Sequence, residues 1–113
     1  MTMIFDGTNG VTFPDSSTQI TAPTQIGVGQ AWVDVTASRA FGTTYTNSTT
    51  KPIQVYIHCS GSGVNTITIG GVLIGSFQAN ASSVNSNASF IVPVGATYLV
   101  STGATLARWS ELR

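Results

Sequence analysis

Hydrophobic and polar residues alternate along several short segments of the chain, a pattern typical of strands that bury one face. The clearest segment spans residues 53–59, in which the odd positions are apolar: Ile53, Val55, Ile57 and Cys59. Successive side chains of a strand point to opposite faces. The pattern therefore predicts a strand with these positions in the core, and with His58 facing outward or lying at an interface.

Turn residues between such segments predict two hairpins. The glycine pair at 70–71 separates two β-branched runs, and it tolerates the positive φ angles of a type I′ or II′ turn. Residues 97–112 predict a closing hairpin that turns at residues 102–103. Tyr98 and Val100 would share one face of the first strand of that hairpin.

Two more segments predict strands, at residues 30–35 and 89–95. One face of the second segment carries three apolar residues, Phe90, Val92 and Val94. Pro93 cannot donate a backbone hydrogen bond, which places this strand on an edge or at a bulge. Several short strands at roughly 8–12-residue spacing, without a helical pattern, predict an all-β fold, an antiparallel β-sandwich or jelly roll.

The first 25 residues differ from the rest of the chain. Turn-forming pairs recur every few residues, and no apolar run supports a strand of more than about four residues. The apolar residues are too sparse to close a core within one chain. We therefore predict an N-terminal arm over residues 1–25 and a β-sandwich domain over residues 26–113, with a linker near Pro23 to Gly29.

Charged residues make up only 7% of the chain, against about 25% in an ordinary soluble domain, and the formal net charge is zero. Hydroxyl and amide side chains replace them, with 17 Thr, 13 Ser and 6 Asn. Such a surface creates no long-range field, so binding to nucleic acid or to an anionic membrane is not expected. Chains with so little charge tend to self-associate, which we interpret as assembly into an oligomer.

No segment has the length of an apolar membrane-spanning helix, and residues 1–11 lack the basic region and apolar core of a signal peptide. We therefore expect synthesis in a cytoplasm, without membrane insertion. The single cysteine, Cys59, excludes an intrachain disulfide.

Residues suited to catalysis or metal binding are few: one His, one Cys and four carboxylates. His58 and Cys59 are adjacent in a predicted strand, so their side chains point to opposite faces and cannot form a nucleophile–base pair. Asp34 and Glu111 are the only carboxylate pair in the predicted sandwich, and nothing in the sequence brings them together. We expect no catalytic residue, no metal and no cofactor, with a glycan-cleaving depolymerase as an alternative.

One stretch carries a recognisable motif, QAWVDVTASRAFGTTYTNSTTKPIQVYI at residues 30–57. It resembles the C-terminal domain of tail fibre proteins from tailed bacteriophages and prophages, with the pattern W-x-D-V-T-x-S-R-x-x-G-x-T-Y-T-N-x-T-x-x-P-I-x-V. The matching positions are Trp32, Asp34, Arg39, Gly42, Tyr45, Asn47, Pro52 and Ile53. The V-P-x-G-A-T-Y step, the terminal W-x-E-L and the early DGTNGVTFPDSSTQ are also similar to that family, whereas Thr50-Lys51 departs from its Thr-Gly step.

The resemblance implies a homotrimeric β-structured tip at the distal end of a fibre, with residues 1–25 as the connector to the shaft. In the virion, the tip would lie beside other tail proteins and contact a bacterial receptor. That receptor would be a surface glycan such as lipopolysaccharide, or an outer-membrane protein. A purely structural domain that trimerises or caps the fibre is the main alternative, and a non-viral trimeric secreted domain is a further one.

Asp34 and Arg39 frame the turn TASR, and two interpretations of them are open. They are either structural, as an ion pair or a capped turn, or they grip a ligand. Trp32 and Trp109 are interpreted as core or interface aromatics rather than as sugar-stacking platforms.

Tyr45 and Asn47 are candidates for receptor binding, because an apolar ring beside an amide suits a glycan; a structural turn is the alternative. Residues 78–89 predict a polar, uncharged loop, a common location for binding residues. The candidates in it are Asn80, Ser82, Asn85 and Asn87. Residues 59–65 predict a second loop of the same kind.

Overall fold

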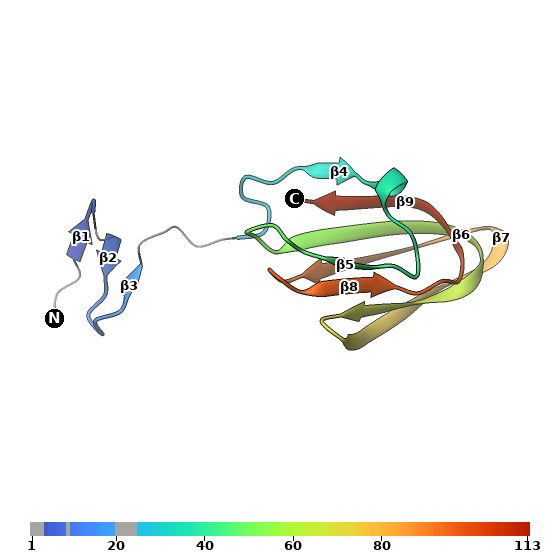
Figure 1. Cartoon of the computed structure of the whole chain (residues 1–113). Helices are drawn as coiled ribbons and strands as arrows, with labels where there is room; N and C mark the ends of the chain where they lie inside the picture. Colours follow the sequence, from blue (N-terminus) through green and yellow to red (C-terminus); the bar gives the residue numbers. More distant parts are fainter. Residues whose placement is uncertain (1–3, 9, 20–24) are drawn as a thin grey trace.

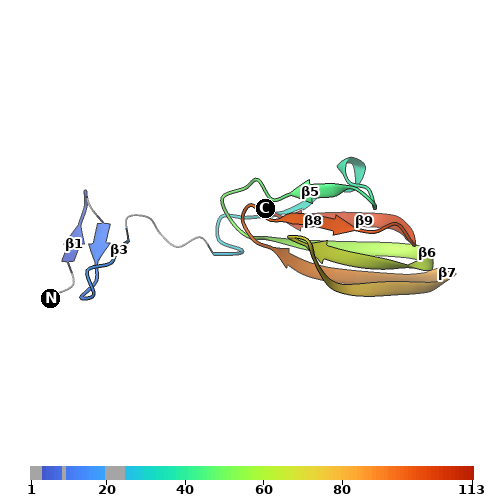
Figure 2. The ribbon, with the colours of Figure 1, turned by 60° about the horizontal axis from the view of Figure 1, so that its bottom comes forward.

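The computed structural model of the chain describes residues 4–8, 10–19 and 25–113. Within these ranges, all regular structure is β-strand except for one turn of 3-10 helix, η1 (Thr36–Ser38). The strands form two antiparallel sheets, one of three strands and one of six (Figure 1). The larger sheet curls into a sandwich-like domain (Figure 2). The predicted all-β class is therefore confirmed.

The small sheet contains three strands in sequence order, β1 (Ile4–Asp6), β2 (Gly10–Thr12) and β3 (Thr18–Gln19). The turn before β3 is stabilised by Asp15, whose Oδ1 accepts hydrogen bonds from the Ser17 amide at 2.9 Å and the Ser17 hydroxyl at 2.5 Å. In the described part of the chain, no strand of this sheet pairs with the larger one. Residues 20–24, which include part of the predicted linker, lie outside the described residues.

The larger sheet is built around two long strands, with four shorter strands attached. Its members are β4 (Trp32–Asp34), β5 (Thr44–Thr46), β6 (Ile53–Ile69), β7 (Val72–Val92), β8 (Thr97–Val100) and β9 (Thr105–Leu112). β6 and β7 pair along the whole of β6 and turn at Gly70 and Gly71. These glycines have φ angles of 58° and 82°, which fits a type I′ turn and confirms the predicted hairpin.

The other edge of β6 is shared by two strands. Residues 54–60 of β6 pair with β9, and residues 67–69 pair with β8. β4 then pairs with β9, and β5 pairs with β8. Because β6 runs through both halves and bends, the sheet curls (Figure 1) and brings Tyr45 of β5 and Tyr98 of β8 into contact with Trp109 of β9. The predicted closing hairpin is therefore wrong: β8 and β9 each pair with β6, not with each other.

The side chain of Asn65 explains why the chain between β8 and β9 does not turn back on itself. The amide of Asn65 is fully buried, donates to the Ser101 carbonyl at 2.7 Å and accepts from the Ala104 amide at 3.1 Å. The Thr66 amide donates to the Ser101 hydroxyl at 2.8 Å. These bonds hold the connection across β6 and satisfy its backbone where no strand pairs with it.

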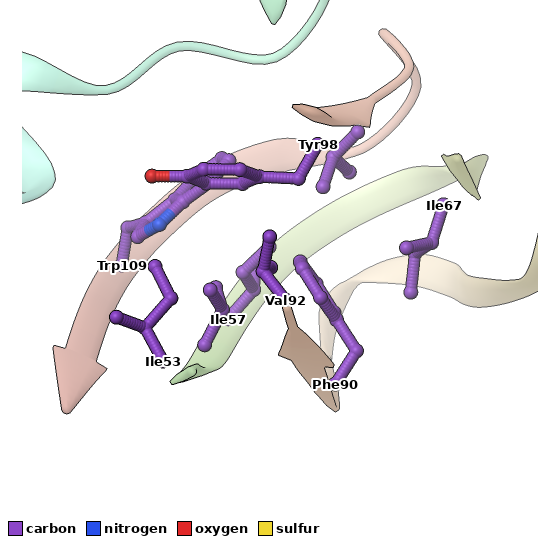
Figure 3. Close-up of a cluster of buried hydrophobic side chains, with 9 residues drawn as sticks. Ile53, Ile57, Ile67, Phe90, Val92, Tyr98 and Trp109 are labelled. Carbon is purple, nitrogen blue, oxygen red and sulfur yellow. The ribbon is translucent and has the colours of Figure 1, made fainter. Parts of the chain in front are cut away.

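The main core lies inside the curl. Its fully or almost fully buried members come from β6, β7, β8 and β9 (Figure 3): Ile53, Val55, Ile57, Ile67, Phe90, Val92, Tyr98, Val100 and Trp109. Cys59 is also buried, in a smaller adjoining cluster. The predicted alternation over residues 53–59 and the shared face of Tyr98 and Val100 are thus confirmed. Val94 is half exposed, contrary to prediction, because β7 ends at Val92 and the chain turns.

Both segments predicted as polar loops belong to strands. Residues 59–65 lie in β6 and residues 78–89 lie in β7, where they pair with each other across a register shift. Ser60 is paired with Asn85 and Gly61 with Ala81, so β7 carries extra residues at this bulge. Ser, Gly and Asn have low strand propensity, but continuous pairing with a neighbouring strand overrides it.

The crossing over β6 leaves no room for a side chain at Gly103. A Cβ there would lie 2.7 Å from the Val64 carbonyl carbon and still closer to its oxygen. Gly103→Ala is therefore expected to lower the free energy of unfolding by about 1–3 kcal/mol, measured by urea denaturation.

Gly75→Ala is the matched control for this substitution. Like Gly103, Gly75 does not have a positive φ angle, but a Cβ added there, in β7, would meet nothing within 4 Å. Its free energy of unfolding should change by less than about 0.5 kcal/mol. Equal effects of the two substitutions would contradict the tight crossing.

Candidate functional site

Residues of the sequence motif surround a buried carboxylate, that of Glu111 in β9, whose side chain has no exposed surface. Oε2 of Glu111 accepts hydrogen bonds from Tyr98 Oη at 2.8 Å, Trp109 Nε1 at 3.0 Å and Arg39 Nε at 3.1 Å. Oε1 accepts from Arg39 Nη2 at 3.0 Å, and Arg113 Nη1 lies 3.3 Å away. Two guanidinium groups and two neutral donors therefore compensate one buried charge.

Tyr45 completes this network rather than facing solvent. Its hydroxyl accepts a hydrogen bond from the Ala40 amide at 2.8 Å, and the guanidinium of Arg39 lies 4.6 Å from the centre of its ring. The ring also packs edge-on against Trp109, with 5.9 Å between centroids. This arrangement favours the structural interpretation of Tyr45 over its role as a receptor-binding candidate.

Burial and the carboxylate of Glu111 shift the pKa values of Arg39 and Tyr98. Burial alone would lower the pKa of Arg39, but the hydrogen bonds and charge of Glu111 outweigh it and raise that pKa. Burial raises the pKa of Tyr98 to about 12, and the hydrogen bond to Glu111 acts in the same direction. The network therefore keeps Arg39 charged and Tyr98 neutral.

Asp34 and Arg39 do not pair with each other in the described part of the chain. Asp34 Oδ1 accepts hydrogen bonds from the Thr36 amide at 3.0 Å and the Thr36 hydroxyl at 2.6 Å, and it thereby caps the first residue of the TASR turn, although the N-cap residue of η1 is Val35. These bonds lower the pKa of Asp34. Its Oδ2 lies 3.0 Å from Nη1 of Arg108, in an ion pair whose two side chains are largely exposed. Of the structural interpretations, the capped turn is confirmed and the ion pair with Arg39 is wrong.

Asn47, predicted as a receptor-binding candidate, is fully buried. Its Nδ2 donates to the carbonyls of Lys51 at 2.8 Å and Val92 at 3.1 Å, while its Oδ1 accepts from the Thr49 amide at 3.1 Å and hydroxyl at 2.6 Å. Both polar atoms are therefore occupied in joining the turn after β5 to the end of β7. Asn47 cannot contact a receptor in this conformation, because no part of it reaches the surface.

The remaining candidates lie on β7. Asn80, Asn85 and Asn87 are exposed, and they pair with even-numbered residues of β6, opposite in direction to the core positions. Ser82 lies at the bulge, and its side chain is outside the described residues. The structure thus gathers the three asparagines on one surface, although not on a loop.

The three asparagines lie on the outward side of the sheet formed by β4, β9, β6 and β7. Cross-strand neighbours share a face, so the register defines its rows. One row contains Trp32, Leu112, Gln54 and Ile91, and the next contains Asp34, Ser110, Tyr56 and Ser89. We call these eight residues the outer face.

The outer face contains a shallow hollow of about 300 Å³ lined by Trp32, Tyr56 and Ser110. Trp32 is 52% exposed and Tyr56 is 39% exposed. Ser110 sits opposite Tyr56 and diagonal to Trp32, so a small side chain separates two large aromatic ones. Of the two tryptophans predicted to be core or interface residues, Trp109 is in the core, whereas Trp32 is not buried within this chain.

The outer face is almost free of uncompensated charge. Asp34 is held by Arg108, and the other polar members are the hydroxyls of Ser89 and Ser110 and the amide of Gln54. Gln54 Nε2 donates to the Ser89 hydroxyl at 2.8 Å. Sequence reasoning missed Tyr56 and Ser110, although the exposed side of the clearest alternating strand pointed to Tyr56.

The groups considered for catalysis lie apart. Asp34 projects from the outer face, whereas Glu111 is buried on the other side of the same pair of strands. Cys59 is buried, which raises the pKa of its thiol, and His58 points the opposite way. Among the described residues, no group of three His, Cys, Asp or Glu is placed to hold a metal ion, and no helix is long and apolar enough to cross a membrane.

Comparisons of the chain with known protein families, with curated proteins and with solved structures gave no match. The fold itself defines an all-β domain with one curled antiparallel sheet. Within it, the buried carboxylate network has the character of a structural centre, and the outer face carries the exposed aromatic residues Trp32 and Tyr56 around a hollow.

Removing the charge of Glu111 should be strongly destabilising. Glu111→Gln leaves Arg39, whose side chain is 13% exposed, without its buried partner. The expected loss is about 3–5 kcal/mol in the free energy of unfolding, measured by urea denaturation. Asp34→Asn is the matched control, since it makes the same chemical change in an exposed pair and should shift the unfolding midpoint little. Equal shifts of the two unfolding midpoints would mean that the buried network stabilises the fold no more than the exposed ion pair does.

Stability should also fall at alkaline pH because of Tyr98. The pKa of this residue is raised to about 12 from an unfolded value near 10. Above pH 10 the unfolded chain gives up its proton first, so a contribution on the order of 2 kcal/mol is present below pH 10 and is lost as the pH rises toward 12. Urea midpoints measured between pH 9 and 12 check this decline. Tyr98→Phe should flatten it, whereas Tyr56→Phe, which removes an exposed phenol, should not.

Proposed function

We propose that the chain is the receptor-binding tip of a bacteriophage tail fibre, and that it attaches the virion to the bacterial surface through the outer face. The observation that carries this proposal is the exposed aromatic hollow between Trp32 and Tyr56 on a nearly uncharged sheet. The motif at residues 30–57 supports the same function, because it resembles fibre tips. No catalytic or cofactor chemistry is part of the proposal.

The mechanism is adhesion by a rigid surface. Half of the outer face, Gln54, Tyr56, Ser110 and Leu112, lies on β6 and β9, which are paired along both edges, so these residues lose little freedom on binding. Trp32 is on the edge strand β4, but the cap between Asp34 and Thr36 and the pairing with β9 hold that strand in place. A preorganised surface of this kind suits repeated, weak contacts with a cell envelope.

The polar chemistry of the outer face favours a surface glycan over a protein receptor. Hydroxyls and amides donate and accept directional hydrogen bonds, as sugar hydroxyls require, and aromatic faces cover the apolar faces of sugar rings. A homotrimeric tip would present three such faces. Linking sites in this way raises avidity by about 10²–10⁴ when the geometry allows simultaneous contact.

A structural role in trimerising or capping the fibre is the second candidate. It is favoured by the tip of the β6–β7 hairpin, where Val72, Leu73 and Ile74 are 63%, 65% and 52% exposed. Three consecutive exposed apolar residues are unusual on a surface that meets only water. The hairpin tip is distinct from the outer face, so both roles are compatible in one chain.

Adsorption to bacteria tests the proposed function. The purified, fluorescently labelled chain, with its oligomeric state known from sedimentation, is mixed with a panel of bacteria and with lipopolysaccharide-truncated mutants of each strain. Adsorption that is lost with the truncation is the expected result, because it identifies a surface glycan as the receptor. Adsorption retained on truncated mutants would favour a protein receptor.

Two other outcomes would contradict the proposed adhesion. A chain that adsorbs to no strain, including the host of the virion that carries it, would leave the capping role as the better explanation. Shortening of isolated glycan chains during incubation would instead support a depolymerase.

A further inference from the structure

We infer that the hollow between Trp32 and Tyr56 binds an uncharged pyranose ring, with Ser110 at its floor. The inference rests on the proposed function only in taking the sugar to come from a bacterial surface. It adds a site, since Tyr56 and Ser110 were not among the expected binding residues, and it narrows the expected glycan to neutral sugar rings.

The register of three strands creates the hollow. Ser110 of β9 is directly opposite Tyr56 of β6 and diagonal to Trp32 of β4. Opposite side chains in an antiparallel pair stand about 5 Å apart, and diagonal ones about 7–8 Å. The short Ser110 side chain therefore leaves a gap over which two aromatic groups can face a flat ligand from both sides.

The exposure of Trp32 and Tyr56 also indicates a binding site. Trp32 and Tyr56 each leave a large part of their surface in water, whereas the neighbouring Trp109 and Tyr98 are buried. Leaving aromatic surface in water forgoes the stabilisation that burial would give. A hollow of about 300 Å³ is at the lower end of the range for small-ligand sites, so it suits a ligand of one or two rings.

The charges around the hollow select a neutral ligand. Asp34 is bound by Arg108 and by Thr36, so its carboxylate is already engaged and does not offer a free partner for a quaternary ammonium group. Arg108, which lies opposite His58 in the adjacent row, is engaged by the same carboxylate, so its guanidinium is not an unpaired partner for an acidic sugar. Ser110, Ser89 and Gln54 remain as hydroxyl and amide groups that can bond to sugar hydroxyls.

Tryptophan fluorescence provides a direct readout of this site. The chain has two tryptophans, of which Trp109 is fully buried and Trp32 is 52% exposed. Acrylamide quenching therefore reports mainly on Trp32. The probes are D-galactose, N-acetyl-D-glucosamine, L-rhamnose and the O-polysaccharide of a strain to which the wild type adsorbs, compared with D-glucuronate and tetramethylammonium.

At least one neutral probe is expected to shield Trp32 from acrylamide, while glucuronate and tetramethylammonium do not. Trp32→Ala should weaken binding of that probe by roughly tenfold or more, measured by calorimetry or on a glycan array. Ser110→Val, which fills the floor of the hollow with a strand-compatible side chain, should weaken it likewise. Leu73→Ala, a truncation of a more exposed residue on the hairpin tip, should leave it unchanged.

Several results would overturn the inference of a sugar site. Shielding by none of the neutral probes, or equal shielding by the charged ones, excludes a neutral-sugar site. Poor quenching of the free wild-type chain would show that Trp32 is covered by a second copy. If Trp32→Ala folds normally by circular dichroism and still adsorbs to bacteria as the wild type does, the site is wrong but the adhesive function stands. Absence of wild-type adsorption with sugar binding intact would instead reject the fibre-tip function alone.

Discussion

Every part of the larger sheet depends on the backbone pairing of β6. This strand of 17 residues pairs with β7 along one edge and with β9 and then β8 along the other. Because two short strands take consecutive stretches of one long edge, the sheet must curl, and its two halves then cover each other. The curl replaces the second sheet of an ordinary sandwich.

The curl also explains why a carboxylate lies in the core. Once β8 folds over β9, Tyr98 and Arg39 approach Glu111 from the side opposite to the outer face. Burying a charge is costly, and an apolar group of the same shape is often no worse for stability. The network instead joins β8 to β9 at a defined place, because the carboxylate accepts hydrogen bonds from Arg39, Tyr98 and Trp109 together. Tyr45 and the segment after η1 are fixed by the same network.

The sequence predicts the local features well and the long-range ones poorly. The alternation over residues 53–59 and the turn at Gly70 and Gly71 were predictable, because each depends on a few neighbouring residues. The pairing of β8 and β9 with β6 was not, since it depends on Asn65 more than 30 residues away. For the same reason the strands that contain residues 59–65 and 78–89 resembled loops. Their composition is that of a surface, and only pairing makes them strands.

The roles of the binding candidates also depend on long-range contacts that the sequence does not reveal. Asn47 has the chemistry of a ligand-binding residue, but its amide is consumed by a turn that the sequence does not display. Trp32 has the chemistry of a core residue, but β4 is an edge strand, and its alternation places Trp32 outside while β9 sends Trp109 and Glu111 inside. β9 thus contributes to both faces at once, with Arg108 and Ser110 on the outer one. The core that fixes β9 therefore also sets the spacing of the hollow, because one strand carries both the buried Glu111 and the exposed side of Ser110.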